Sequence, residues 1–156
     1  MDYTTLQKTM AYLTAILLGA LAGAGIYTFV YAQGASYLSN DPKACINCHI
    51  MNEQFDGWMK SSHRNVAGCN DCHVDHGLIS KWLSKGENGF YHSVAFTFQN
   101  FHEPIQLRER SSHVLERNCL RCHRELVDTI TAYHRGITDD ISCVKCHASV
   151  GHGPTK

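Results

Sequence analysis

The placement of cysteine and histidine is the main chemical feature of this chain. All eight cysteines belong to Cys-x-x-Cys-His motifs. Two thiols separated by two residues can each form a thioether with one haem, and the histidine that follows can bind the iron. The spacing therefore predicts four covalently bound haem c groups, numbered here in chain order. The motifs comprise Cys45, Cys48 and His49; Cys69, Cys72 and His73; Cys119, Cys122 and His123; and Cys143, Cys146 and His147.

Other uses of paired cysteines explain these motifs less well. A structural zinc site combines two Cys-x-x-Cys pairs and does not need a histidine after each pair. A disulfide framework needs an even number of cysteines but gives the histidines no role. A thioredoxin-like redox site would need a βαβ pattern around the motif, and that pattern is missing. Zinc and disulfides therefore remain as the alternatives to haem.

The motifs fall into two similar pairs. The first and second motifs are separated by the same number of residues as the third and fourth. A Ser-Ser-His sequence precedes the second and the third motifs, so that His63 and His113 each stand six residues before a first cysteine. This repeat predicts two dihaem modules in tandem, with a reused ligand position.

The chain is short for four haems. It has 156 residues and a formal net charge of +0, which gives no electrostatic basis for binding nucleic acid. So little chain cannot wrap four haems and also build a large apolar core. We therefore expect a mainly α-helical fold with much irregular structure, in which the haems themselves form the core.

One apolar segment precedes the motifs. No charged residue occurs from Met10 to Tyr31, and a helix of this length can cross a hydrocarbon core of roughly 30 Å. A cleaved signal peptide is the alternative, but its apolar region is usually shorter. Bacteria attach c-type haem outside the cytoplasmic membrane. We therefore predict a cytoplasmic amino terminus (1–9), a transmembrane anchor helix (10–33) and a periplasmic tetrahaem domain (34–156).

The chain resembles the NapC/NirT family of membrane quinol dehydrogenases. One amino-terminal helix followed by four haem motifs is typical of this family, and Tyr37–His49 and His92–Thr97 are similar to its small subunits of cytochrome c nitrite reductase. The resemblance implies that the protein oxidises menaquinol and passes the electrons to a periplasmic reductase, usually a pentahaem nitrite reductase. A nitrate or other periplasmic reductase is the alternative partner. A cytochrome that works without quinol is the alternative function.

The resemblance also implies a set of iron ligands. For haem 1 it implies Met51, two residues after His49, in place of that histidine. For haem 4 it implies His147, while relatives differ in the distal ligand. We prefer His134 for that position, with His113 or a lysine of the partner enzyme as alternatives. The implied pairs for haems 2 and 3 are His73 with His152 and His123 with His63.

A quinol site needs proton acceptors beside an electron acceptor near the membrane. Haem 1 follows the anchor most closely along the chain, so we expect it to accept the electrons. The segment from His76 to Phe101 mixes aromatic and basic residues, and its apolar side chains would enter the membrane interface. On a helix, Lys85 and His92 share one face. The resemblance implies that Lys85 flanks the quinol, and it leaves open whether His92 is a base or an iron ligand. His76 and His102 receive no role.

Overall fold

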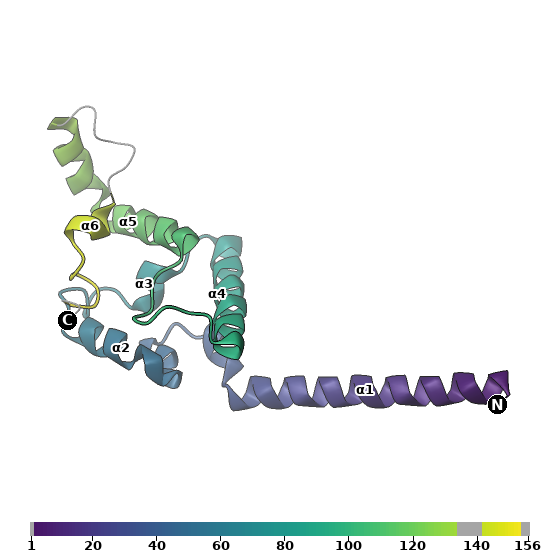
Figure 1. Cartoon of the computed structure of the whole chain (residues 1–156). Helices are drawn as coiled ribbons and strands as arrows, with labels where there is room; N and C mark the ends of the chain where they lie inside the picture. Colours follow the sequence, from purple (N-terminus) through teal and green to yellow (C-terminus); the bar gives the residue numbers. More distant parts are fainter. Residues whose placement is uncertain (1, 134–141, 154–156) are drawn as a thin grey trace. The chain divides into compact units, whose positions relative to one another are not determined.

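The computed structural model describes residues 2–133 and 142–153 (Figure 1). The chain folds as two compact units, Met1–Ser36 and Tyr37–Lys156. The preferred distal ligand of haem 4, His134, lies outside the described residues.

The first unit contains one long helix, α1 (Tyr3–Tyr31). It begins earlier than the predicted anchor, and its side chains are exposed along its whole length. Apolar residues occur on all sides of α1, which has no polar face of the kind that a surface helix carries. It is long and apolar enough to cross a membrane. This helix is therefore consistent with the predicted membrane anchor.

The second unit combines two long helices with short helices and irregular connections in its described residues (Figure 1). No β-strand occurs between residues 2 and 133 or between 142 and 153. The prediction of a mainly α-helical, partly irregular fold is confirmed. After η1 (Gly34–Leu38), the helices in chain order are η2 (Pro42–Asn47), η3 (His49–Met51), α2 (Asn52–Met59), α3 (Cys69–His73), α4 (Leu78–Phe98), α5 (Glu109–Tyr133) and α6 (Cys143–Cys146).

The short helix α3 packs against α5 through a buried amide. Asn118 on α5 donates from Nδ2 to the carbonyl oxygens of Cys72 and Val74, each at 2.9 Å. These carbonyls lie at the end of α3, where a helix leaves its last acceptors without partners. An ion pair between Arg117 and Asp75, at 2.9 Å, adds a second link. Asn118 therefore connects the second motif to the helix that carries the third.

A carboxylate on α5 holds the start of α6. Glu116 accepts hydrogen bonds from Ser142 Oγ at 2.6 Å and from the backbone nitrogen of Cys143 at 2.9 Å. It thereby satisfies a backbone donor in the first turn of α6. The start of the fourth motif is consequently attached to α5 three residues before the third motif begins.

Few side chains are buried by protein atoms alone. In the described parts of the second unit, the buried apolar residues are Val74 and Val114, and the buried polar residues are Lys85, Ser111 and Asn118. This agrees with the expectation that so short a chain builds no large apolar core.

Candidate functional site

Three of the four haem motifs form regular helical turns. The second motif makes up α3, the third lies within α5, and the fourth forms α6 with His147 as its C-cap. The first motif differs. Its helix η2 ends at Asn47, Cys48 has extended backbone angles (φ -99°, ψ 113°), and His49 begins the new helix η3. His49 therefore does not continue the helical turn of its own cysteines.

The structure brings together the two predicted histidine pairs. The ring centroids of His73 and His152 are 5.8 Å apart, and those of His63 and His123 are 6.0 Å apart. Two imidazoles that bind one metal ion from opposite sides, with metal–nitrogen bonds of about 2 Å, have their centroids about 6 Å apart. The spacing of both pairs therefore fits an iron held between two histidines.

Backbone carbonyls orient both distal histidines. Nδ1 of His152 donates to the carbonyl of Gln54 at 2.8 Å, and Nδ1 of His63 donates to the carbonyl of Val150 at 3.3 Å. A hydrogen bond at Nδ1 leaves Nε2 as the metal-binding nitrogen. Burial and the neighbouring His152 lower the pKa of His73 to about 4. This keeps the imidazole neutral, as a metal ligand must be.

The segment after the fourth motif contributes to both histidine pairs. It contributes His152 to one pair and the carbonyl of Val150 to the other. Gly57 on α2 allows this segment to come close, because a Cβ built on Gly57 would collide with the carbonyl oxygen of His152. The glycine is therefore required by the close approach of two backbones.

The motif thiols are arranged in chain order. Cys45 and Cys69 hydrogen-bond to each other, which lowers the pKa of Cys45 to about 7. A hydrogen bond to the carboxylate of Glu116, followed by burial, raises the pKa of Cys143 to about 11, and Cys143 is also hydrogen-bonded to Cys119. Cys72, at the end of the second motif, is close enough to Cys119 for their charges to interact. Successive motifs are therefore neighbours from the first to the fourth.

One cluster of possible metal ligands occurs outside the histidine pairs in the described residues. Single ligand atoms of Glu116, Cys119 and Cys143 all lie within 4.8 Å of one another. The cluster takes one cysteine from each of two motifs and no histidine. It therefore does not match the Cys₄ or Cys₂His₂ set of a structural zinc site.

Met51 and the described histidines outside the two pairs have mixed surroundings. Met51 is half-buried at the end of η3, and its backbone nitrogen donates to the carbonyl of Cys48 at 2.9 Å. His113 is exposed on α5, and His102 is exposed as well. Nε2 of His76 bonds to the Asp71 carbonyl at 3.2 Å, which indicates a local structural role.

Lys85, predicted to flank the quinol, is buried rather than free. Only 5% of its surface is exposed. Its Nζ donates to Ser39 O at 2.6 Å, to Asn40 Oδ1 at 3.1 Å and to Leu38 O at 3.4 Å. An ammonium group has three donors, so all of them are engaged. Desolvation and the nearby Lys81 lower the pKa of Lys85.

His92, the second predicted quinol residue, lies two turns further along α4. Its Nδ1 is 2.7 Å from the hydroxyl of Tyr37, and the two ring centroids are 6.0 Å apart. Desolvation and the positive charge of Arg108 lower the pKa of His92. Local sequence patterns do not reveal this contact, because its partners are 55 residues apart.

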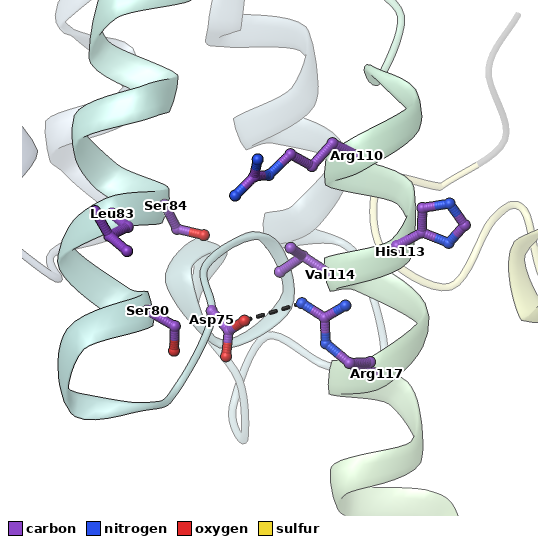
Figure 2. Close-up of a pocket in the computed structure, with 8 residues that line it drawn as sticks. All are labelled: Asp75, Ser80, Leu83, Ser84, Arg110, His113, Val114 and Arg117. Atoms are coloured by element: carbon purple, nitrogen blue, oxygen red, sulfur yellow. Dashed lines mark hydrogen bonds and ion pairs between the residues drawn. The ribbon is translucent and has the colours of Figure 1, made fainter.

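A pocket of about 320 Å³ opens between α4 and α5 (Figure 2). Neither Lys85 nor His92 lines it. Figure 2 shows the Asp75–Arg117 ion pair at its centre and the ring of His113 directed away from this pair. The pocket therefore does not coincide with the predicted quinol site. Its lining residues are Asp75, Ser80, Leu83, Ser84, Arg110, His113, Val114 and Arg117.

Comparison with known proteins decides the family. Residues 5–156 match the model of the NapC/NirT cytochrome c family, N-terminal region. The chain belongs to this family. It is therefore a c-type cytochrome with covalently bound haem, and the predicted resemblance is confirmed.

Two curated relatives cover almost the whole chain. The cytochrome c-type protein NrfH of Wolinella succinogenes is 34% identical over 160 residues, which span 96% of this chain and 90% of that protein. The cytochrome c nitrite reductase subunit NrfH of Nitratidesulfovibrio vulgaris is 31% identical over 143 residues, which span 91% and 85% respectively.

A solved structure shares the fold. It is a chain from the crystal structure of the cytochrome c nitrite reductase NrfHA complex bound to the inhibitor HQNO. The TM-score is 0.64 at 26% sequence identity, and the alignment covers 97% of this chain and 92% of that chain. The likeness therefore extends over both the apolar helix and the cysteine-rich unit.

Proposed function

We propose that this chain is the quinol-oxidising, electron-transfer subunit of a cytochrome c nitrite reductase complex. The observation that carries the proposal is the match to NrfH proteins along almost the full length of both chains, together with the likeness to a chain of an NrfHA complex that binds HQNO. The reductant is menaquinol, and the acceptor is the pentahaem catalytic subunit, which reduces nitrite to ammonia.

Four covalently bound haems carry the electrons in this proposal. Bound haem supplies one-electron redox chemistry. The eight cysteines hold the haems, and the two histidine pairs at 5.8 and 6.0 Å fit haems 2 and 3. For haem 4 the described residues supply His147. Because successive motifs are neighbours, haems bound to them would lie next to one another and would supply a path for electrons from the first motif to the fourth.

The backbone of the first motif supports Met51 as the ligand of haem 1. The extended conformation of Cys48 separates His49 from the helical turn of the cysteines, whereas His73 completes that turn in the second motif. Met51 ends the three-residue helix that His49 begins. The first haem would then have a ligand set unlike that of haems 2 and 3 and would suit the reaction with quinol.

The protein lies in the bacterial cytoplasmic membrane in this proposal. The helix α1 crosses the bilayer once, and the haem domain faces the periplasm, where c-type haem is attached. The apolar side chains of α4 contact the membrane interface. Several of them are strongly exposed, which suits contact with lipid. They include Leu78, Ile79, Phe90 and Phe98.

Lys85 and His92 are the proposed quinol-site residues. Near neutral pH an imidazole can accept a proton directly. Lys85 has its donors engaged by residues 38–40, so its role is to hold the site and to stabilise a developing quinolate by its charge. The two residues therefore have different tasks on one face of α4.

Replacement of Lys85 by leucine tests the site. We expect Lys85→Leu to retain four attached haems and reduction by dithionite but to lose at least about tenfold in menaquinol-driven haem reduction. Lys81→Leu is the matched control on the same helix, because the ammonium group of Lys81 makes no hydrogen bond to the described residues. This variant should keep the parent rate. Menaquinol oxidation at the parent rate by Lys85→Leu would place the site elsewhere.

The partner is tested by purification from the native membrane. We expect a pentahaem nitrite reductase to co-purify and menaquinol to drive nitrite reduction by the purified complex. Co-purification of a nitrate reductase or another periplasmic reductase would assign the chain to a different respiratory complex. Failure of menaquinol to reduce the haems would favour the quinol-independent function.

A further inference from the structure

The segment that precedes the first motif runs along one face of α4. His92, Gly89 and Lys85 lie on this face, and residues 37–40 contact all three. Tyr37 bonds to His92, its ring lies beside Gly89, and the following residues bind Lys85. A Cβ built on Gly89 would lie 3.6 Å from the nearest atom of the Tyr37 ring, which is ordinary van der Waals contact. The tyrosine ring therefore rests on the surface of α4.

The second haem motif holds the same segment from another side. Asn70, between the cysteines of that motif, donates from Nδ2 to Ser39 O and to Asn40 Oδ1, each at 3.0 Å. These two oxygen atoms are also acceptors for Lys85. Together with the bond from Lys85 to Leu38 O, five hydrogen bonds thus hold residues 38–40, which follow Tyr37. These bonds to the neighbouring residues consequently help to hold the Tyr37 hydroxyl beside His92.

The charged and titratable groups around this contact come from three segments. Burial, with Cys48 and Cys45 nearby, raises the pKa of Tyr37 to about 12, so the phenol stays protonated near neutral pH. Desolvation by burial, together with Arg108 from the segment before α5, lowers the pKa of His92. The guanidinium of Arg108 is itself paired with Glu87 at 3.2 Å. His92 therefore faces one neutral hydroxyl and one guanidinium group.

We infer that Tyr37 is a positioning and proton-relay partner of His92, an inference that rests on the proposed oxidation of quinol at this site. A phenol hydroxyl both donates and accepts hydrogen bonds. It can therefore pair with His92 Nδ1 whether or not that nitrogen carries the proton. Nε2 is the ring nitrogen left for the substrate. The ligand expected at this site is a membrane quinol whose hydroxyl group donates a hydrogen bond to Nε2 of His92.

Each electron that leaves the quinol is accompanied by one proton. Nε2 of His92 accepts the proton as the quinol O–H bond breaks, and one electron leaves the quinol for a ferric haem. The Nδ1 proton moves to the oxygen of Tyr37 as Tyr37 releases its own hydroxyl proton to water. One proton thus enters at Nε2 and one leaves at Tyr37. Before the second proton and electron follow, His92 returns to its starting tautomer by exchange with water, in which it loses the Nε2 proton and regains one at Nδ1.

Removal of the hydroxyl while the ring is kept tests this role. Tyr37→Phe in the full-length holoprotein should lower the kcat of menaquinol-driven haem reduction roughly tenfold, the effect of one lost hydrogen bond of ordinary strength. It should also change the pH profile of kcat. The affinity for HQNO, measured on the oxidised protein, should change less than about twofold. Tyr91→Phe, one residue from His92, is the matched control and should behave as the parent.

A double variant separates a relay from an independent effect. If Tyr37 acts through His92, Tyr37→Phe with His92→Ala should be no slower than His92→Ala alone. Additive losses would overturn the inference, as would a parent rate and pH profile in Tyr37→Phe. A loss of HQNO affinity as large as the loss of rate would also overturn it, because the hydroxyl would then only hold the site together. If menaquinol does not reduce the parent protein, the proposed function is refuted, and the relay is refuted with it.

Discussion

The role of a side chain in this protein depends on which of its polar atoms are already engaged in hydrogen bonds. His152 and His63 use Nδ1 for backbone carbonyls, which leaves Nε2 as the nitrogen that can bind a metal. Lys85 leaves no donor free, because its three hydrogen bonds go to residues 38–40. The same residue type can therefore be a ligand, a structural group or a base, according to which of its atoms the fold occupies.

The two distal histidines should each control one haem. Replacing His152 with methionine should perturb one low-spin haem signal, assigned to haem 2, and His63→Met should perturb another, assigned to haem 3. Methionine is a weaker donor than imidazole, so each change should raise the reduction potential of its haem. Electron paramagnetic resonance and redox titration measure both effects. His102→Met is the control, and unchanged spectra in His152→Met would remove that residue from the ligand set.

At the scale of the elements, short contacts between helices set the positions of the motifs. Asn118 joins α3 to α5, Glu116 joins α5 to α6, and Gly57 lets the carboxyl-terminal segment approach α2. None of these residues belongs to a haem motif. Their effect on the haems is indirect, because each places a motif or a ligand.

Gly57 should tolerate no side chain. The Cβ of Gly57→Ala would collide with the carbonyl of His152, so the terminal segment must shift, at a cost of about 1–3 kcal/mol. We expect lower stability to denaturant and an altered haem 2 spectrum. Gly86→Ala on α4 is the control, because nothing lies within 4 Å of its Cβ and alanine favours a helix by about 0.5–1 kcal/mol. Equal stability of the two variants would contradict the collision.

Asn118 should contribute more to stability than the neighbouring ion pair. Asn118→Leu leaves the carbonyls of Cys72 and Val74 without this donor in a buried position, which should cost about 1–3 kcal/mol. Arg117→Ala removes an ion pair between an exposed arginine and the half-buried Asp75, which should cost less than about 1 kcal/mol. Denaturant unfolding of both holoproteins gives the comparison. A larger loss in Arg117→Ala would show that the ion pair, not the buried amide, joins the two helices.

At the scale of the whole molecule, covalent chemistry takes the place of a large apolar core. The buried apolar side chains in the described part of the second unit are only Val74 and Val114. A chain of this size with so little burial needs covalent or metal links to hold its helices. Thioether bonds at every motif and iron bonds between distant histidines would supply such links.

The intact mass of the purified protein should therefore exceed the mass of the chain by four haems. Replacement of Cys143 and Cys146 by alanine should reduce this excess to three haems and should lower stability, because α6 would lose its covalent link. Mass spectrometry under denaturing conditions measures the count. An excess that corresponds to zinc, or to no haem, would refute the assignment of the motifs.

The sequence alone determined the features that depend on neighbouring residues. The spacing within each Cys-x-x-Cys-His motif indicates haem attachment, because both thiols and the histidine belong to one short loop. The uncharged run from Met10 to Tyr31 indicates the apolar helix, because length and composition decide whether a helix can span a bilayer. The expectation of a mainly helical, partly irregular fold follows from the small amount of chain available for each haem.

Only the tertiary structure decided the contacts between distant segments. His73 and His152 lie far apart in the chain, and no periodicity links them. The family resemblance implied this pair, but only the structure shows how the close approach of two backbones at Gly57 brings their rings together. The burial of Lys85 follows in the same way from the path of residues 38–40 along α4. Such contacts depend on how separate helices pack, and packing is a property of the complete fold that local patterns do not encode.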